Sequence, residues 1–152
     1  DGDVAMFESL AINLYLAQTY GKGALWPDDA AGQAQCLQWT LFSVTEAEPP
    51  GSTRLVQFIF KSKEERSQEV IDAAAERSKA PLNTLETTLQ SQSYLAGDSF
   101  TVADLNVACS VEYFVRTNFD LSPWPKVKDW IARCMDRPAF QAMTAIKAKE
   151  AA

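Results

Sequence analysis

Glu8 and Ser9 are the residues of this chain whose types and placement best suit binding chemistry. They lie near the start of a predicted helix, where free backbone N–H groups and the positive end of the helix dipole attract a carboxylate. The Ser9 hydroxyl adds a hydrogen-bond donor, and the Glu8 carboxylate offers the opposite charge to an ammonium group. Together they suit the zwitterionic head of an amino acid or of a γ-glutamyl peptide. The alternative is that Glu8 only offsets the helix dipole and Ser9 is an ordinary polar helix-start residue.

Other groups for catalysis are scarce. The chain has no histidine, which removes the commonest general base, most zinc-site designs and every Ser-His or Cys-His dyad. We therefore expect no metal site and assign no catalytic residue. Cys36, Cys109 and Cys134 are widely spaced, and each lies in an apolar helical pattern. This pattern predicts buried thiols and a reducing, cytoplasmic location.

The composition is that of one compact domain. A chain of 152 residues with 47% hydrophobic content can bury a sizeable core, so we expect a single domain over residues 1–152. The formal charge of −6, with no long Lys/Arg run, argues against nucleic-acid and anionic-membrane surfaces. No apolar run approaches the roughly 18 residues of a membrane span. Because the chain opens Asp-Gly-Asp without Met, we expect it to be part of a longer protein.

The segment after Ser99 carries a complete helix start. Thr101 is placed to act as N-cap, with its hydroxyl accepting from the backbone N–H of Asp104. The Asp104 carboxylate can reach back to the Thr101 N–H, which makes an Asp version of the capping box. Phe100 and Leu105 then bracket the cap as a hydrophobic staple. These devices predict a stabilising helix origin at this point.

Hydrophobic spacing predicts helices along almost the whole chain, and therefore an all-α helical bundle. The N-terminal half is expected to hold helices over about 6–20 and 30–46. Pro-Pro-Gly at 49–51 is expected to end the second of them. Residues 53–60 are ambiguous, and a short helix or an extension is favoured over a strand. Ser62 and Glu65 offer a capping box for a third long helix, which should kink or break near Ala80 because of Pro81. Pro125 and Pro138 are typical first residues of two more helices.

Several of these segments resemble soluble glutathione transferases. The string Tyr-Leu-Ala-Gly-Asp-Ser-Phe-Thr-Val-Ala-Asp-Leu at 94–105 is similar to the start of the core helix in the family's all-helical C-terminal domain. Residues 7–16 look like the link from the family's N-terminal domain into the next helix, and residues 125–140 look like its last two helices. The resemblance covers nearly the whole chain. The pattern Trp39…Glu46…Pro49-Pro50 is most similar to bacterial branches.

The resemblance implies roles for individual residues. It implies that Glu8 and Ser9 hold the γ-glutamyl end of glutathione, the co-substrate. It also implies that the long helix lines the pocket for an electrophilic small molecule, for which Phe42, Glu46 and Pro49 are the expected lining residues. The alternative for these three is ordinary core or dimer packing. Thr101 and Asp104 are expected to serve stability and folding.

The family activates the glutathione thiol with a residue of a thioredoxin-like N-terminal domain, and these 152 residues contain no βαβ pattern that could replace it. The resemblance therefore implies a detoxifying glutathione transferase that needs this missing domain, with the chain inactive alone and homodimeric in the intact protein. One alternative is a non-catalytic transferase-like domain for protein–protein assembly, like those attached to translation factors. Another is an autonomous helical protein that keeps only the dimer surface.

Overall fold

The computed structural model describes the backbone of residues 1–150 and the side chains of residues 1–146. Every regular element of this part of the chain is helical, so the predicted all-α class is confirmed. The elements are α1 (Ser9–Tyr20), α2 (Ala30–Phe42), α3 (Glu48–Leu55), α4 (Gln68–Thr88), α5 (Val102–Arg116), α6 (Pro125–Met135) and α7 (Pro138–Glu150), with π turns η1 (Ser43–Ala47) and η2 (Val56–Phe60) and a 3-10 turn η3 (Lys63–Glu65).

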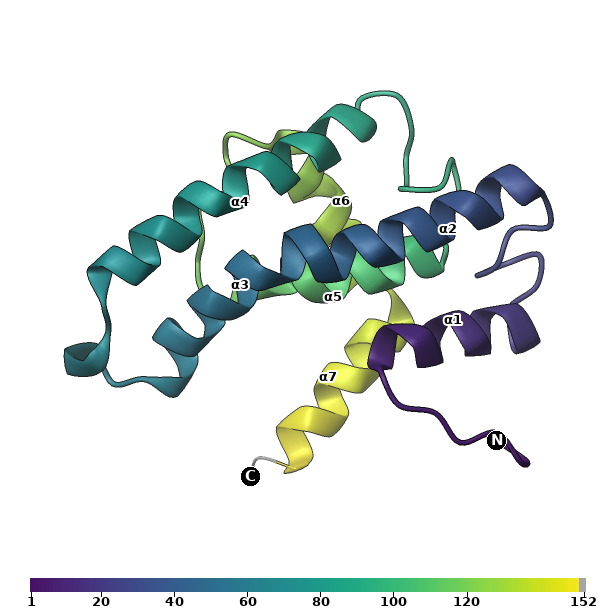
Figure 1. The fold of residues 1–152 in the computed structure, drawn as a ribbon, viewed down its shortest axis with the longest axis horizontal. Coiled ribbons are helices and arrows are strands. Elements are labelled where there is room, and N and C mark those ends of the chain that lie inside the picture. Colours follow the sequence, from purple (N-terminus) through teal and green to yellow (C-terminus); the bar gives the residue numbers. More distant parts are fainter. Residues whose placement is uncertain (151–152) are drawn as a thin grey trace.

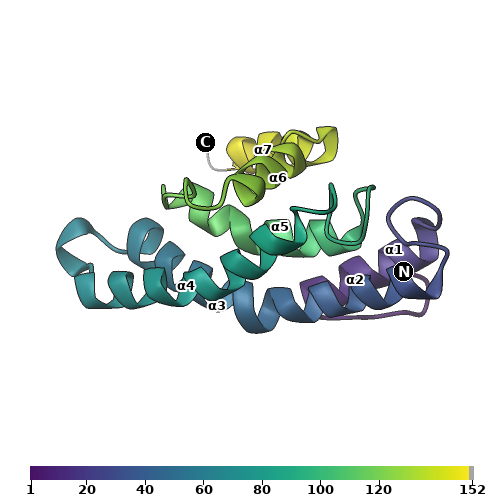
Figure 2. The ribbon, with the colours of Figure 1, turned by 90° about the horizontal axis from the view of Figure 1, so that it is seen from above.

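Helix α5 is the centre of the bundle. It packs against α1, α2, α3 and α6 (Figure 1). Figure 2 shows it lying between a layer that holds α1 to α4 and a second layer of α6 and α7. Its buried residues Val107, Val111 and Phe114 meet Trp130 and Leu85 in one continuous core. A helix with apolar residues on several faces is expected at such a central position.

The Pro-Pro-Gly segment does not end a helix, so that prediction was wrong. Helix α2, the π turn η1, α3 and η2 follow one another without a break through Phe60 (Figure 1). Pro49 and Pro50 are the second and third residues of α3, which directly follows the π turn η1. The preceding π turn widens the helix, which relieves the clash that a proline ring makes with the carbonyl one turn back. The preferred interpretation of residues 53–60, an extension of the helix, is confirmed.

Helix α4 differs from the prediction at its start, and it is not broken at Pro81. The Ser62–Glu65 capping box exists, but it opens the 3-10 turn η3, and α4 begins at Gln68 with Ser67 as its cap. Pro81 does not break the helix, which is continuous from Gln68 to Thr88.

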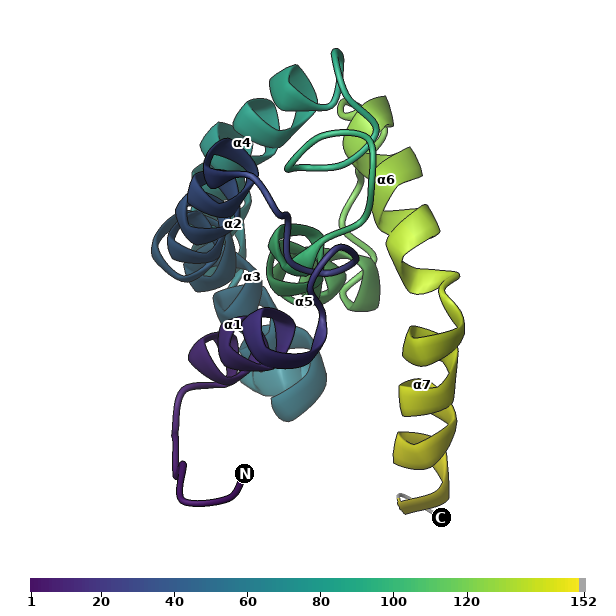
Figure 3. The same cartoon turned by 90° about the vertical axis from the view of Figure 1, so that its right-hand side faces the viewer.

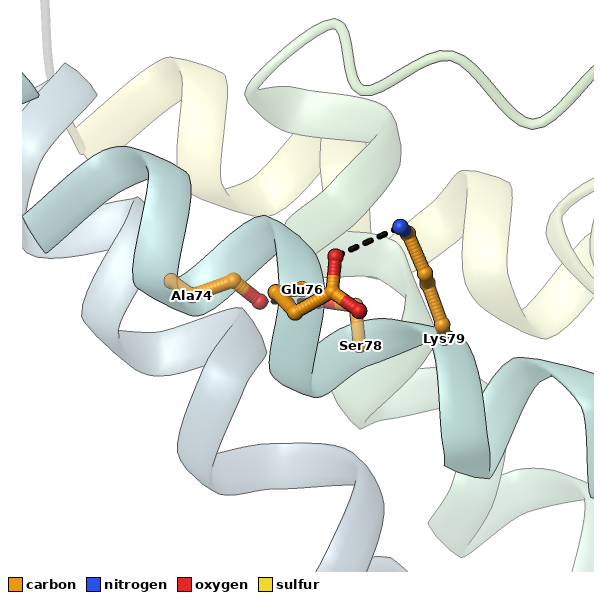
Figure 4. Close-up of polar contacts among 4 residues, drawn as sticks. All are labelled: Ala74, Glu76, Ser78 and Lys79. Atoms are coloured by element: carbon orange, nitrogen blue, oxygen red, sulfur yellow. Dashed lines mark hydrogen bonds and ion pairs between the residues drawn. The ribbon is translucent and has the colours of Figure 1, made fainter. Parts of the chain in front are cut away.

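Local contacts along α4 are weak individually. The Ser78 hydroxyl donates to the Ala74 carbonyl at 2.7 Å, and the exposed Lys79 pairs with Glu76 at 2.5 Å (Figure 4). An exposed pair three residues apart on a helix contributes about 0.2–0.5 kcal/mol. The stability of α4 therefore comes mainly from its buried residues, among them Leu82 and Leu85.

The remaining helix starts are largely as predicted. Helices α6 and α7 begin at Pro125 and Pro138. The carboxylate of Glu86, on α4, accepts from the first backbone N–H groups of α6, those of Lys126 and Val127, at 3.2 and 3.0 Å. The first helix begins at Ser9 and not near residue 6. Figure 3 shows α1 and α7 on opposite sides of α5, with the N-terminus and the last turn of α7 at the same end of the molecule.

Candidate functional site

The Glu8–Ser9 pair lies at the first turn of α1, and both residues are exposed. The Glu8 carbonyl accepts the first helical hydrogen bond, from Ile12 N–H at 3.0 Å, and no side chain caps the helix. The first-turn N–H groups therefore lack intrahelical partners, as at any helix start. An exposed hydroxyl, an adjacent carboxylate and these N–H groups therefore lie together at the start of α1, and their role in binding stays a prediction.

Glu8 adopts a strained backbone conformation. Its φ of 72° lies in the left-handed region that side-chain-bearing residues rarely occupy, with ψ at 106°. Glycine would occupy this position without the steric cost, yet the sequence places a carboxylate there. Strain of this kind costs about 1–3 kcal/mol and clusters at functional sites. The sequence could not reveal this feature, because nothing in the residue types predicts a left-handed Glu.

The three residues expected to line an electrophile pocket lie along the α2–α3 segment. Phe42 is half-buried and packs edge-on against Trp39, with ring centroids 5.1 Å apart. Glu46 is exposed on the π turn η1, and Pro49 is half-buried in the first turn of α3. The three are spaced four and three residues apart along one continuous helical segment, and none of them lines the apolar pocket described next. Their role in binding stays a prediction.

An apolar pocket of about 470 Å³ lies between α5, α6 and α7. Its apolar walls include Phe100, Leu105, Phe140 and Met143. Glu112, Arg116, Arg137 and Tyr113 contribute the polar part of its lining. The sequence analysis missed this pocket, because half-buried apolar residues on helices give the same pattern as core residues. The two halves of the predicted staple, Phe100 and Leu105, both lie in its wall.

Two of the three cysteines also line this pocket. Cys134 is buried, and Cys109 is exposed, so the expectation of three buried thiols holds only for Cys36 and Cys134. Burial raises the pKa of the Cys134 thiol far above its usual range, with the nearby Asp104 carboxylate acting in the same direction. Burial is also the main cause of the raised pKa of Cys36. Both buried thiols are therefore kept in the neutral, unreactive form.

The Thr101–Asp104 capping box is present at the start of α5 as predicted, with both halves formed. One oxygen of the fully buried Asp104 carboxylate accepts from Thr101 N–H at 2.9 Å. The other accepts from Leu95 N–H at 2.8 Å and from the Trp130 indole N–H at 2.9 Å. Burial raises the pKa of Asp104, while these donors act in the opposite direction. The contacts are structural, because every Asp104 partner belongs to the bundle itself.

The part of the chain that the structure describes holds no group of three or more Cys, Asp or Glu side chains arranged to bind a metal ion. None of its helices combines the length and the hydropathy needed to cross a bilayer.

Comparison with known families gives one match that covers more than half of the chain. The family described as "Glutathione S-transferase, C-terminal domain" matches residues 49–138. Among curated relatives, Glutathione S-transferase GstB of Escherichia coli K12 is 27% identical over 96% of this chain, and Glutathione S-transferase 1 of Triticum aestivum is 33% identical over 93% of it. Elongation factor 1-gamma-B of Xenopus laevis is 29% identical over 91% of this chain.

Solved structures show the same likeness. A theta class glutathione S-transferase from Xanthomonas axonopodis pv. citri, with glutathione bound, superposes with a TM-score of 0.86 at 27% identity over 93% of this chain. A glutathione transferase from Burkholderia graminis, with two glutathione molecules per subunit, superposes with a TM-score of 0.79 at 28% identity over 91% of it.

These relatives are longer than the chain. It spans 70% of the E. coli relative, 67% of the wheat relative and 31% of the elongation factor. It spans 68% of the Xanthomonas structure and 59% of the Burkholderia structure. The match therefore concerns one helical part of a larger protein in each case.

Proposed function

Because the chain belongs to the glutathione S-transferase family through its helical C-terminal domain, we propose that residues 1–152 form this domain in a glutathione transferase. The reaction is the attack of glutathione thiolate on an electrophilic small molecule, a detoxification chemistry. The presence of glutathione in two structures of similar proteins supports this choice of co-substrate. The reducing cytoplasm is the compartment that suits a glutathione enzyme with buried neutral thiols.

Glu8 and Ser9 are proposed to bind the γ-glutamyl end of glutathione. Its carboxylate accepts from the Ser9 hydroxyl and the N–H groups at the start of α1, and its ammonium group pairs with Glu8. The observation that carries this assignment is the left-handed backbone of Glu8, an exposed and strained residue at the N-cap of α1. Such strain persists where the surrounding structure holds a residue in place, and it clusters at active sites and ligand clamps.

The thiol of glutathione must be activated by a group from a second domain. No residue of this chain is assigned to activate it, since a nearby hydrogen-bond donor or positive charge must stabilise the thiolate. We propose that a thioredoxin-like domain, attached before Asp1, supplies this group. Phe42, Glu46 and Pro49 are proposed to line the electrophile pocket in the assembled protein.

The test uses the full reading frame that contains this chain, with glutathione and a chloronitrobenzene acceptor. We expect turnover for the full protein and none for the 152-residue chain. Ser9→Ala and Glu8→Gln should each raise the KM for glutathione about tenfold and change kcat little, because they remove ground-state contacts. Thr19→Ala, at an exposed position of the same helix, is the matched control. A KM that stays at the wild-type value in both variants would contradict the assignment.

A second function is favoured by one specific observation. The likeness to elongation factor 1-gamma extends over 91% of this chain. The second candidate function is therefore a non-catalytic role in protein–protein assembly. The two functions separate in the same assay. A full protein that binds no glutathione and turns over no acceptor, while forming a stable complex with another protein, would support the assembly role.

A further inference from the structure

Helix α1, which carries Glu8 and Ser9, has little apolar attachment to the bundle. Ala17 is its one buried residue, and Leu16 and Tyr20 are exposed. It packs on α5, while a surface helix is normally held by a continuous apolar stripe. Leu14 is half-buried and packs against the core, so the apolar contact of α1 is small and gives its position little directional specificity.

A hydrogen bond between two asparagines supplies a specific link. The Asn13 side-chain amide, on α1, donates to Asn106 Oδ1, on α5, at 2.8 Å, across 93 residues of sequence. Asn106 is fully buried. A buried amide without partners costs about 1–3 kcal/mol, so the pair strongly favours one placement of α1 over its neighbours.

Asn106 is itself fixed by the rest of the bundle. Its amide nitrogen donates to Thr40 Oγ1, on α2, at 2.9 Å, and Thr40 in turn donates to the Cys36 carbonyl at 2.8 Å. The Ser43 hydroxyl, on the π turn η1, donates to the Asn106 backbone carbonyl at 3.1 Å. Asn106 is therefore a rigid acceptor on which α1, α2 and η1 converge.

The link acts close to the candidate site. Asn13 follows Ser9 by four residues, so the two lie one turn apart on the same face of α1. We propose that Asn106, through Asn13, is the positioning residue that fixes the first turn of α1 and with it Glu8 and Ser9. This inference rests on the proposed role of that pair in glutathione binding. Neither asparagine touches the ligand in this account.

Hydrogen exchange of the 152-residue chain tests the positioning directly, without any ligand. Asn13→Ala removes the donor at a half-buried position, so the fold is retained. We expect the amides of α1 to exchange about five- to tenfold faster, while the amides of Val107 to Val111 on α5 keep their rate. Gln18→Ala, at an exposed position of α1, should leave all of these rates unchanged.

A second variant shows whether the effect passes through Asn106. Asn106→Leu keeps the size of the side chain and removes the acceptor. In this background, Asn13→Ala should give no further acceleration of α1 exchange, because the two residues act as one unit. An additive effect, or an Asn13→Ala chain that exchanges like Gln18→Ala, would overturn the inference.

The KM of the full protein separates this inference from the proposed function. Asn13→Ala should raise the KM for glutathione about fivefold and leave kcat within about twofold, since a displaced binding group affects substrate binding first. Faster α1 exchange together with an unchanged KM supports the positioning of α1 by Asn106 and counts against glutathione binding by Glu8 and Ser9. Unchanged exchange together with a raised KM for Ser9→Ala overturns the positioning and leaves the proposed function standing.

Discussion

Asp104 is the residue on which most of the fold converges. Its carboxylate joins the loop at Leu95, the cap at Thr101 and the indole of Trp130 on α6. All three donors are buried with it, so each would lose its partner if the carboxylate were removed. One side chain thus fixes the start of α5 and the docking of α6 on it.

Asp104→Ala should therefore lower the free energy of unfolding by about 3–5 kcal/mol. Asp104→Asn keeps one acceptor oxygen and should cost about half as much. The measurement is urea unfolding followed by Trp fluorescence. Asp98→Ala, at an exposed position of the preceding loop, serves as control and should stay within about 0.5 kcal/mol of the wild type.

Because of the buried thiols, the free energy of unfolding should fall as the pH rises into the alkaline range. Because the pKa of Cys134 is raised in the folded state, folding favours its protonated form. This contribution is fully present below the ordinary thiol pKa of about 8.5 and is lost as the pH rises above it. From pH 8.5 to pH 10 the wild type should lose about 1.6 kcal/mol more than Cys134→Val does. Equal losses in urea titrations of both proteins would refute this.

Burial should also decide how fast each cysteine reacts. A thiol reagent at pH 8 should modify the exposed Cys109 rapidly and reach Cys36 and Cys134 only after unfolding. Mass spectrometry of the labelled peptides identifies the sites, and Cys109→Ser should remove the rapid phase. Rapid labelling of Cys134 in the native chain would show that the pocket wall opens readily.

The residue scale also shows what sequence can and cannot predict. The bond between Thr101 and Asp104 is local, so residue spacing sufficed to predict it. The bonds from Trp130 to Asp104 and from Asn13 to Asn106 join distant segments, and spacing carries no such information. The one sequence signal for the bond between Asn13 and Asn106 was the polar residue Asn106 among the apolar positions of α5, and it does not identify the partner residue.

At the scale of elements, the α2–α3 segment is shaped by its irregularities. The π turn η1 lets two prolines lie within a continuous helix, and Gly51 then lets α3 approach α5 closely. A Cβ at Gly51 would lie 3.2 Å from the Ser110 carbonyl oxygen and 3.3 Å from Tyr113 Cβ. The sequence indicated a stop here because proline and glycine usually end helices, while tertiary packing decided otherwise.

Gly51→Val should destabilise the chain by about 2 kcal/mol or more, because the branched side chain cannot fit between α3 and α5. The comparison is Ala34→Val, which places the same side chain at an exposed position of α2 and should cost about 0.5 kcal/mol. Thermal unfolding followed by circular dichroism gives both values. Equal effects of the two substitutions would mean that helix propensity, and not close approach, governs this position.

At the scale of the whole molecule, exposed apolar residues gather on α2 and on the π turn η1 that follows it. Leu37, Leu41 and Val44 follow one another at helical spacing and are 46%, 64% and 46% exposed. A chain with a formal charge of −6 remains dispersed more easily than a neutral one, yet such a stripe favours self-association. We propose that the homodimer implied by the family resemblance uses this stripe as part of its contact.

Leu41→Arg should therefore shift the full protein from dimer toward monomer in sedimentation velocity runs at micromolar concentration. The introduced charge would be buried without a partner in the dimer, which is strongly unfavourable. Gln35→Arg adds the same charge to another face of α2 and should leave the dimer intact. A dimer that survives Leu41→Arg would place the contact elsewhere.

The two π turns also carry an evolutionary consequence. Each holds one more residue per turn than an α-helix, so removing one residue from Ser43–Ala47 or Val56–Phe60 converts it to ordinary α geometry. The surfaces on either side would then keep their angular phase. Between Ala30 and Phe60, these are the places where a gene could gain or lose a single codon and still encode the same bundle.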